Sequence, residues 1–185
     1  KLGNYNPDFM LGFNNQFNYK NWNLGFLFDW RQGGIIVSRT KALGNVGGQL
    51  AETAFRPEDG IVPEGVVNTG TEENPVYTQN TVAVSAESYY RQFYDRNHEE
   101  NNTYDASFLK LRQLSIGYTF DNLSFFNQDA TLNLSLIGKN LFAITDNPHF
   151  DPEQLAVQGQ GFISGVEDMS YATTRSIGFK AGFNF

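Results

Sequence analysis

The segment from Phe9 to Trp30, FMLGFNNQFNYKNWNLGFLFDW, alternates apolar and polar residues with a period of two. In its first half the large apolar residues occupy odd positions, interrupted by Asn15: Phe9, Leu11, Phe13, Phe17 and Tyr19. In its second half they occupy even positions: Trp22, Leu24, Phe26, Phe28 and Trp30. A period of two is typical of a strand with one apolar face. The change of parity predicts two antiparallel strands, 9–19 and 22–32, joined by a hairpin at Lys20-Asn21, where Asn tolerates positive φ.

Three further segments show the same alternation and predict strands at about 107–120, 130–142 and 174–185. In the first of these, Leu109 and Leu111 are out of phase with the later apolar positions, which predicts a β-bulge near Arg112-Gln113. The last has one apolar row: Ile177, Phe179, Ala181, Phe183 and Phe185. The sequence therefore predicts an all-β fold.

The expected connections alternate between short and long. The short ones are Lys20-Asn21 and 121–129, and the long ones are the loops 34–105 and 143–173. Outer-membrane barrels have this organisation, with short periplasmic turns and long extracellular loops. Inside the first loop, SAESYYRQFYDR (85–96) predicts one short helix capped by Ser85. Its aromatic stripe (Tyr89, Tyr90, Phe93 and Tyr94) is interpreted as a packing surface against the barrel or a partner, more readily than as a ligand site.

Periodicity alone does not identify the medium that the apolar rows face, because soluble antiparallel sheets alternate in the same way. Strand length favours lipid. Eleven residues at about 3.3 Å per residue, tilted by about 45°, give roughly 25 Å, close to the apolar band of a membrane barrel. Aromatic residues also gather at the expected periplasmic strand ends, as in an interfacial girdle: Tyr19, Trp22, Tyr118, Phe120, Phe183 and Phe185.

Composition excludes several classes of protein. The 185 residues include no cysteine and only two histidines, so disulfides, thiol chemistry and a His-rich metal site are not expected. The net charge of -7 argues against nucleic-acid binding. The mean hydropathy of -0.42 is typical of soluble proteins, but averaging a lipid-facing and a lumen-facing row hides a barrel signal.

Five strands cannot close a membrane barrel, since the smallest have about eight. Open strand edges in hydrocarbon would leave backbone groups unpaired. The chain also begins at Lys1 without Met, which indicates a fragment or a processed product. We expect its strands to be completed by an N-terminal remainder of the same barrel or by another polypeptide, and less readily by copies of itself.

Four motifs resemble the C-terminal end of SusC/RagA-type TonB-linked outer-membrane transporters. They occur in the family's order over nearly the whole chain: GNYNPDFMLGFNNQFNYKNWNLGFLFDWRQGG (3–34), YDASFLKLRQLSIGYTF (104–120), LSLIGKNLFAIT with FDPE (134–145 and 150–153), and TTRSIGFKAGFNF (173–185). The resemblance implies that the chain supplies the C-terminal strands and two extracellular loops of a 22-stranded transmembrane β-barrel in the bacterial outer membrane.

The resemblance also implies partners and a function. The family imports oligosaccharides or peptides together with a SusD-like lipoprotein lid and is driven by TonB. A terminal aromatic signal, here Phe183 and Phe185, is read by the barrel-assembly machinery. The glycines nearby, Gly178 and Gly182, depart from the usual spacing of that signal.

Candidate site residues follow from charge and position. Basic residues would cost about 2–4 kcal/mol against lipid at mid-bilayer, so Lys110, Arg112, Arg31 and Lys139 are expected to face the lumen or lie above the membrane. Arg31 and Lys139 are the substrate-path candidates, with ordinary lumen ion pairs as the favoured alternative. The candidates for contact with the lid or another partner lie in the long loops: Tyr89, Tyr90, Phe93, Asp151 and Glu153.

The acidic residues of the second long loop permit a Ca²⁺ site, because carboxylates are its preferred ligands: Asp146, Asp151, Glu153, Glu167 and Asp168. Their spacing does not follow an EF-hand, so turn formation is favoured and no metal or other cofactor is expected. No nucleophile and base stand together, so catalysis is not expected either. Two alternative functions remain: a non-transporting barrel scaffold in an assembly or secretion complex, and a soluble glycan-binding β-sandwich.

Overall fold

A computed structural model describes residues 1–125, 128–147, 149–158 and 161–184 and divides into two units. The first unit consists of Lys1–Ile36 and Tyr104–Phe185, and the second of Val37–Thr103. The described residues contain no helix long and apolar enough to cross a bilayer.

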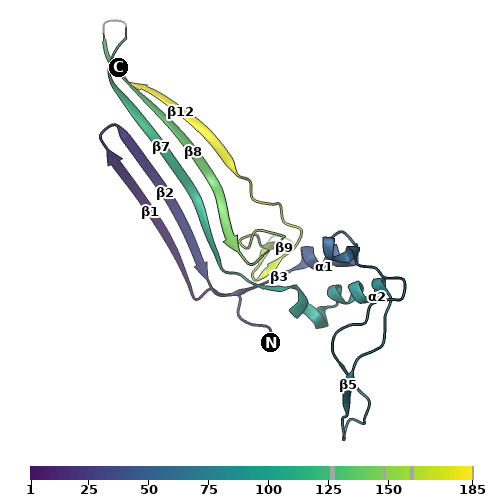
Figure 1. Ribbon diagram of the computed structural model, residues 1–185. Helices are drawn as coiled ribbons and strands as arrows, with labels where there is room; N and C mark the ends of the chain where they lie inside the picture. Colours follow the sequence, from purple (N-terminus) through teal and green to yellow (C-terminus); the bar gives the residue numbers. More distant parts are fainter. Residues whose placement is uncertain (126–127, 148, 159–160, 185) are drawn as a thin grey trace. The chain divides into compact units, whose positions relative to one another are not determined.

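The first unit is built on a five-stranded antiparallel sheet with the strand order β1-β2-β7-β8-β12 (Figure 1). Its strands are β1 (Phe9–Tyr19), β2 (Trp22–Gln32), β7 (Phe108–Phe125), β8 (Gln128–Thr145) and β12 (Ser176–Asn184). Smaller sheets have the orders β11-β3-β6 and β10-β9. Their strands are β3 (Ile35–Ser38), β6 (Thr103–Asp105), β9 (Ala156–Gln158), β10 (Gly161–Ile163) and β11 (Val166–Glu167).

The strands β1 and β2 occupy the ranges expected from their alternation, and Tyr19 pairs with Trp22 across the hairpin. The residue with positive φ in that turn is Lys20 (φ 52°), and Asn21 is not the left-handed residue. The Asn21 amide instead donates to the Thr119 carbonyl at 2.7 Å and to Asp121 at 2.8 Å. The turn was therefore located correctly, but Asn21 joins the hairpin to β7.

The predicted bounds of the short connection, 121–129, are wrong, because β7 extends to Phe125 and β8 begins at Gln128. Asp121 and Asn122 have the composition of a turn, but Asn122 adopts a positive φ of 56° inside an irregularity of the ladder. Pairing resumes at Leu123 opposite Ala130. A bulge with turn-like composition was thus mistaken for the turn itself.

The predicted bulge at Arg112-Gln113 is confirmed. The register shifts between Leu27 and Phe28 on β2 and between Leu111 and Gln113 on β7, so Arg112 has no partner in either ladder. The extra residue changes the parity of β7. As a result its early and late apolar residues point to the same side of the sheet.

The register separates one apolar face from one polar face. A complete row across the five strands on the apolar face is Phe17, Leu24, Ile116, Leu136 and Phe179. The adjacent row on the polar face is Asn18, Asn23, Gly117, Ser135 and Lys180. The strand order and the alternation therefore agree across the whole sheet.

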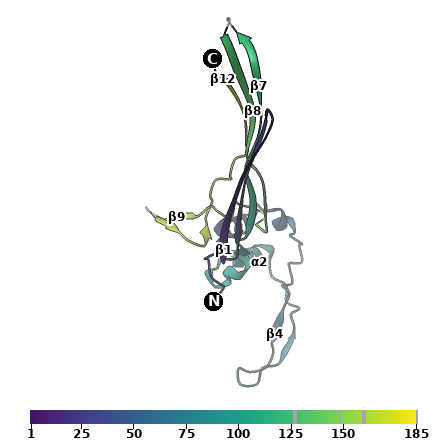
Figure 2. The same ribbon diagram turned by 90° about the vertical axis from the view of Figure 1, so that its left-hand side faces the viewer.

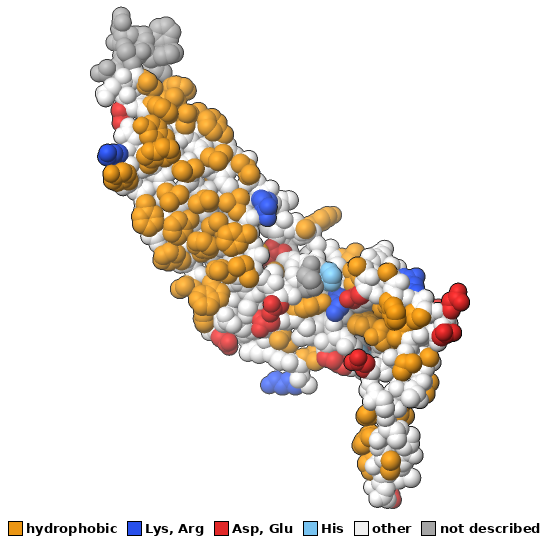
Figure 3. Space-filling model, in the orientation of Figure 1, with side chains coloured by type: hydrophobic (Ala, Val, Ile, Leu, Met, Phe, Trp, Pro, Cys, Tyr) orange, Lys and Arg blue, Asp and Glu red, His pale blue; other side chains and the backbone are white. Residues whose placement is uncertain are grey.

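Within the described parts of the chain, no second layer covers the apolar face. Phe17 is 54% exposed and Phe179 is 69% exposed. Figure 3 shows hydrophobic side chains gathered over the sheet, and Figure 2, which views the sheet near its edge, shows a single layer of strands there. The small core of this unit lies at the end of the strands away from the Lys20-Asn21 hairpin, around Phe108, Leu111 and Ala106.

Aromatic rings lie near both ends of the apolar face. At the hairpin end, Trp22 packs edge-on against Tyr118 at 4.8 Å between ring centroids. The sequence predicted this group only, but a second one lies near the other end, where Phe9 contacts Trp30 at 5.0 Å. The Trp30 indole N–H donates to Gln32 at 3.3 Å. Such rings, apolar with a polar edge, are typical of both interfaces of a membrane wall.

The second unit contains more regular structure than predicted. Its helices are α1 (Arg39–Val46), α2 (Ala86–Arg91) and the 3-10 helices η1 (Ala51–Ala54), η2 (Gln92–Tyr94) and η3 (Arg96–Asn102). Its two-stranded sheet joins β4 (Val66–Asn68) to β5 (Tyr77–Gln79). The predicted helix over 85–96 is α2 with η2, and Ser85 caps it by accepting from the Ser88 N–H at 3.1 Å. Only one helix was expected in the loop 34–105, so α1 was missed.

Candidate functional site: a charged cluster on the polar face

The polar face carries a group of charged residues close to the bulge of β7. Lys110 lies opposite Asp29 on β2, and Arg112 is the bulged residue two positions further along. The loop after β8 brings Asp151 and Glu153 to the same place. We call these five residues the charged cluster. It joins three segments that lie far apart in sequence.

The contacts within the charged cluster are continuous. Arg112 donates to Asp29 from Nε at 3.1 Å and from Nη2 at 2.7 Å. Its Nη2 also pairs with Glu153, and Lys110 pairs with both Asp151 and Glu153, the latter at 2.5 Å. The planar guanidinium of Arg112 donates hydrogen bonds in fixed directions, so it orients the two carboxylates more tightly than a lysine ammonium would.

Burial makes these contacts necessary. The Lys110 side chain is 5% exposed, and its ammonium lies over the ring of Phe108 at 4.7 Å. An ammonium removed from water without a partner would be strongly unfavourable. The two carboxylates therefore supply the partners that the buried ammonium needs, and these ion pairs tie the loop to the sheet.

Asp151 is the centre of the loop side of the cluster. It accepts from Lys110, from the Thr173 hydroxyl and from the backbone N–H of Glu153 at 3.0 Å. Burial by itself would raise the pKa of the Asp151 carboxyl, but these hydrogen bonds and the charge of Lys110 outweigh it and lower that pKa below its ordinary value. Asp151 is thus held as a carboxylate that connects the start of the loop to its end at Thr173.

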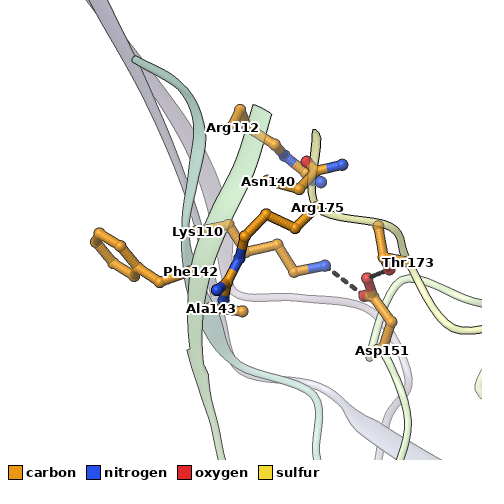
Figure 4. Close-up of a pocket in the computed structure, with 8 residues that line it drawn as sticks. All are labelled: Lys110, Arg112, Asn140, Phe142, Ala143, Asp151, Thr173 and Arg175. Carbon is orange, nitrogen blue, oxygen red and sulfur yellow. Dashed lines mark hydrogen bonds and ion pairs between the residues drawn. The ribbon is translucent and has the colours of Figure 1, made fainter. Parts of the chain in front are cut away.

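A pocket of about 280 Å³ borders the charged cluster (Figure 4). It is lined by Lys110, Arg112, Asn140, Phe142, Ala143, Asp151, Thr173 and Arg175. Figure 4 shows Phe142 pointing to the opposite side of β8 from Lys110 and Asp151. The polar lining of the pocket therefore comes from the polar face of the sheet and from the loop after β8. Arg175 is exposed and forms no ion pair with any described residue, so it remains available for an anionic group.

The structure separates the two substrate-path candidates, Arg31 and Lys139. Both lie on the polar face, as do Lys110 and Arg112. Arg31 pairs across the ladder with Phe108, whereas Lys139 pairs with Gln113 and Ser176. The Arg31 Nη2 donates to the Tyr5 carbonyl at 2.8 Å, so it anchors the N-terminal segment, while Lys139 is exposed. Neither belongs to the charged cluster.

The partner-contact candidates of the first loop occupy different environments. Tyr90 is buried, and its hydroxyl lies 2.7 Å from the Glu52 carbonyl and 3.0 Å from that of Phe55. Its ring stacks on Phe93 at 6.4 Å, and Tyr89 contacts both rings. Tyr90 is therefore a packing residue of the second unit, whereas Tyr89 and Phe93 are half-buried.

The remaining predicted residues are placed as follows. Asp151 and Glu153 are engaged in the charged cluster, and their role as contacts of a lid or another partner stays a prediction. Phe183 is exposed on the apolar face opposite Leu132, and Phe185 lies outside the described residues. The described residues contain no group of three acidic or histidine side chains arranged to hold a metal ion, and Glu167 lies buried near Ser170.

Sequence reasoning missed three residues of the site. Asp29 was counted only as a polar residue of its strand, and Thr173 and Arg175 only as part of a terminal motif. The one signal in the sequence was the pair Lys110 and Arg112, whose expected position on the polar face required acidic partners. The separation of 83 positions between Arg112 and Asp29 hides that pairing from any local pattern.

Comparison with known proteins supplies the family context. No family model matches the chain. It is 30% identical over 155 residues to TonB-dependent receptor P3 of Formosa agariphila, covering 82% of this chain and 13% of that protein. It is 25% identical over 181 residues to TonB-dependent receptor P39 of the same organism, covering 95% of this chain and 16% of that protein.

A solved structure agrees in fold. The RagAB peptide importer in its "open-open" state matches with a TM-score of 0.59 and 22% identity, over 97% of this chain and 17% of that chain. The chain thus spans 13–16% of the length of the curated relatives and 17% of this solved chain.

Proposed function

This chain belongs to the TonB-dependent receptor family, and we propose that it forms part of the wall and mouth of an outer-membrane importer of the SusC/RagA type. The proposed cargo is an oligosaccharide or a peptide. The proposed partners are the remainder of the same barrel, a SusD-like surface lipoprotein and TonB, which supplies the energy.

One observation carries the proposal: a single-layer sheet exposes an uninterrupted apolar row on one face and an amide- and glycine-rich row on the other. Phe179 and Phe17 are more than half exposed at opposite edges of that sheet. Soluble proteins rarely leave an apolar patch of this size uncovered. Acyl chains on one side and a watery lumen on the other satisfy both faces, as in a transporter barrel.

The alternative of a soluble β-sandwich needs a second sheet packed against the apolar face. Among the residues that the structure describes, none forms such a layer. The alternative of a non-transporting barrel scaffold uses the same wall and has no observation in its favour. The similarity in fold to the RagAB peptide importer supports the interpretation as part of a transporter.

The edges of the sheet support completion by further barrel strands. β1 and β12 each pair on one side only within the described chain. Unpaired backbone groups are expensive in hydrocarbon, so we propose that both edges continue into strands of the same receptor. The barrel-assembly machinery would recognise the end of the chain through Phe183 and Phe185.

The charged cluster gives the lumen side a role. Arg175 and Lys139, which pairs with the neighbouring Ser176, offer positive charge without an ion pair among the described residues, beside a loop that Asp151 and Glu153 hold to the wall. We propose that this region guides polar or anionic parts of the cargo. Arg31 contributes by fixing the N-terminal segment at the wall.

The test is uptake by cells that express the full-length receptor. Labelled oligosaccharides and peptides are offered to the parent strain, to a strain lacking the receptor, and to a strain depleted of TonB. We expect accumulation of one cargo class to fall to background in both altered strains. Unchanged uptake in either strain contradicts the proposal.

A further inference from the structure

The second unit contains a braced hairpin, residues 58–84, which we call the arm. Its base is closed by Ile61 and Val84, which exchange two backbone hydrogen bonds of 2.8 Å. Further along, Asn80 donates from its backbone N–H to Gly65 at 2.9 Å and from its side chain to Pro63 at 2.9 Å. The strands β4 and β5 form its outer part, labelled in Figures 1 and 2.

The end of the arm is fixed by side chains as well. The side-chain oxygen Oδ1 of Asn68 accepts from the backbone N–H groups of Gly70 and Val76, both at 3.0 Å. The Thr69 N–H donates to the Val76 carbonyl at 2.7 Å. An isolated two-stranded hairpin is marginally stable in water, and these hydrogen bonds hold the two strands of the arm together beyond the backbone ladder.

Apolar side chains of the arm are uncovered. Val66 is 61% exposed and Tyr77 is 64% exposed. Asn68 pairs with Tyr77, and Val66 lies two residues before Asn68, so Val66 and Tyr77 share one face. Val67 and Thr78 share the other, and Val67 is 41% exposed. The face of Val66 therefore also carries Tyr77, the one aromatic residue of the arm, whereas the face of Val67 carries Val76, which lies two residues before Thr78 and is 55% exposed.

The arm has one sign of charge. Residues 57–90 contain no lysine, arginine or histidine. The acidic side chains of the arm are all exposed: Glu58, Asp59, Glu64, Glu72 and Glu73. No ion pair neutralises any of the five within the described chain. The arm that carries the Val66–Tyr77 strip thus bears charge of one sign only.

We propose that the arm is a preformed docking element for a partner protein whose contact surface is basic and surrounds an apolar strip. Order before binding lowers the entropic cost of association, and aromatic residues such as Tyr77 contribute strongly at interfaces. The acidic rim adds electrostatic steering toward a basic surface. The predicted contact residue Tyr90 is already engaged inside the unit, whereas Val66 and Tyr77 of the arm are more than half exposed.

Other occupants fit less well. Anionic membrane surfaces repel a segment with five carboxylates and no cation. A second copy of the arm would place the same negative rims against each other in a two-fold contact. A basic protein surface satisfies both the charge and the apolar strip.

Site-specific photocross-linking in cells tests the inference on the full-length receptor. A benzophenone amino acid is placed at Tyr77 or, as the matched control on the opposite face, at Thr78. We expect a discrete protein adduct from position 77 in several-fold higher yield than from position 78, with the cross-linked peptide of the partner rich in Lys and Arg. Adducts to lipid or to the receptor itself only, or equal yields from the two positions, would overturn the proposal.

Charge reversal on the arm provides a second test of the inference. The triple variant Glu64→Lys, Glu72→Lys, Glu73→Lys is expected to lower the yield from position 77 by about tenfold. The corresponding triple Gln variant is expected to give an intermediate yield and serves if the Lys variant fails to reach the membrane. An unchanged yield in a correctly assembled variant refutes the charge argument. Since the readout is cross-linking and not uptake, its failure is distinct from failure of the proposed transport.

Discussion

The two faces of the five-stranded sheet satisfy their side chains by different means. On the apolar face, rows such as Phe17, Leu24 and Ile116 contact each other and are otherwise exposed, so they depend on the medium outside the chain. On the polar face, Lys110 and Arg112 are satisfied by carboxylates of the chain itself. This difference is what the proposed barrel wall requires, with lipid against one face and water against the face that carries Lys110 and Arg112.

The largest expected effect follows from breaking the internal pairing on the polar face. Lys110→Met leaves Asp151 and Glu153 partly unpaired, and removal of one partner of a buried ion pair typically costs about 3–5 kcal/mol. We expect the loop after β8 to detach, with exchange of the Glu153 and Gln154 amides faster by a hundredfold or more in hydrogen-exchange mass spectrometry. Lys139→Met, which removes an exposed lysine from the same face, should leave those amides unchanged.

A lysine placed on each face in turn sharpens the comparison. Phe13→Lys and Leu134→Lys introduce charge on the apolar face, at a cost of about 2–4 kcal/mol near mid-bilayer. Asn14→Lys and Asn133→Lys, the neighbours on the polar face, are expected to cost less than about 1 kcal/mol. The amount of folded receptor in the outer membrane, read from heat-modifiable gel mobility, measures the difference. Equal losses from both faces would refute the assignment of the medium.

Acidification tests the electrostatic nature of the polar face. The pKa of Asp151 is lower in the folded protein than its ordinary value of 3.8. Its stabilising contribution is therefore complete above that value and is lost as the pH falls through the folded pKa. We expect protection of the loop amides to be constant from neutral pH to about 5 and to decline below about 4.

The matched control for this titration is Asp151→Asn, which should show weaker protection with no decline in the acid range. Protection that rises on acidification would give the opposite sign and would contradict the role of Asp151.

The smallest expected effect concerns the hairpin turn that joins β1 to β2. Lys20 has a positive φ of 52°, which non-glycine residues adopt at a cost. Lys20→Gly should stabilise the hairpin by up to about 1 kcal/mol, while Asn21→Gly should weaken it, because the Asn21 amide bonds β7 are lost. Thermal unfolding of the two variants in detergent gives the comparison.

Much of the sheet could be predicted because alternation is a local property. The phase change between Leu111 and Leu114 was enough to locate the bulge at Arg112. The irregularity at Asn122 was misassigned because a bulge and a turn favour the same residue types. The helix α1 was missed because RTKALGNV has no marked apolar stripe and no acidic residue in its first turn.

The charged cluster could be predicted only in part. The position of Lys110 and Arg112 follows from the cost of charge near lipid, which is a local argument. Their partners Asp29 and Glu153 are 83 and 41 positions away from Arg112. The strand order brings Asp29 beside Arg112, and the loop after β8 brings Glu153 there. The negative charge of the arm is visible in the sequence. The side-chain hydrogen bonds that hold its strands together, such as those accepted by Asn68, are visible only in the structure.

Direct measurement of the medium at each face tests the central claim. Spin labels at Phe13 and Leu136 on one face, and at Asn14 and Gln113 on the other, are introduced singly into the full-length receptor in lipid bilayers. The account predicts that the first pair is accessible to oxygen and inaccessible to a polar nickel chelate, and that the second pair shows the reverse. Chelate access at Phe13 and Leu136 equal to that at Asn14 and Gln113 would contradict it.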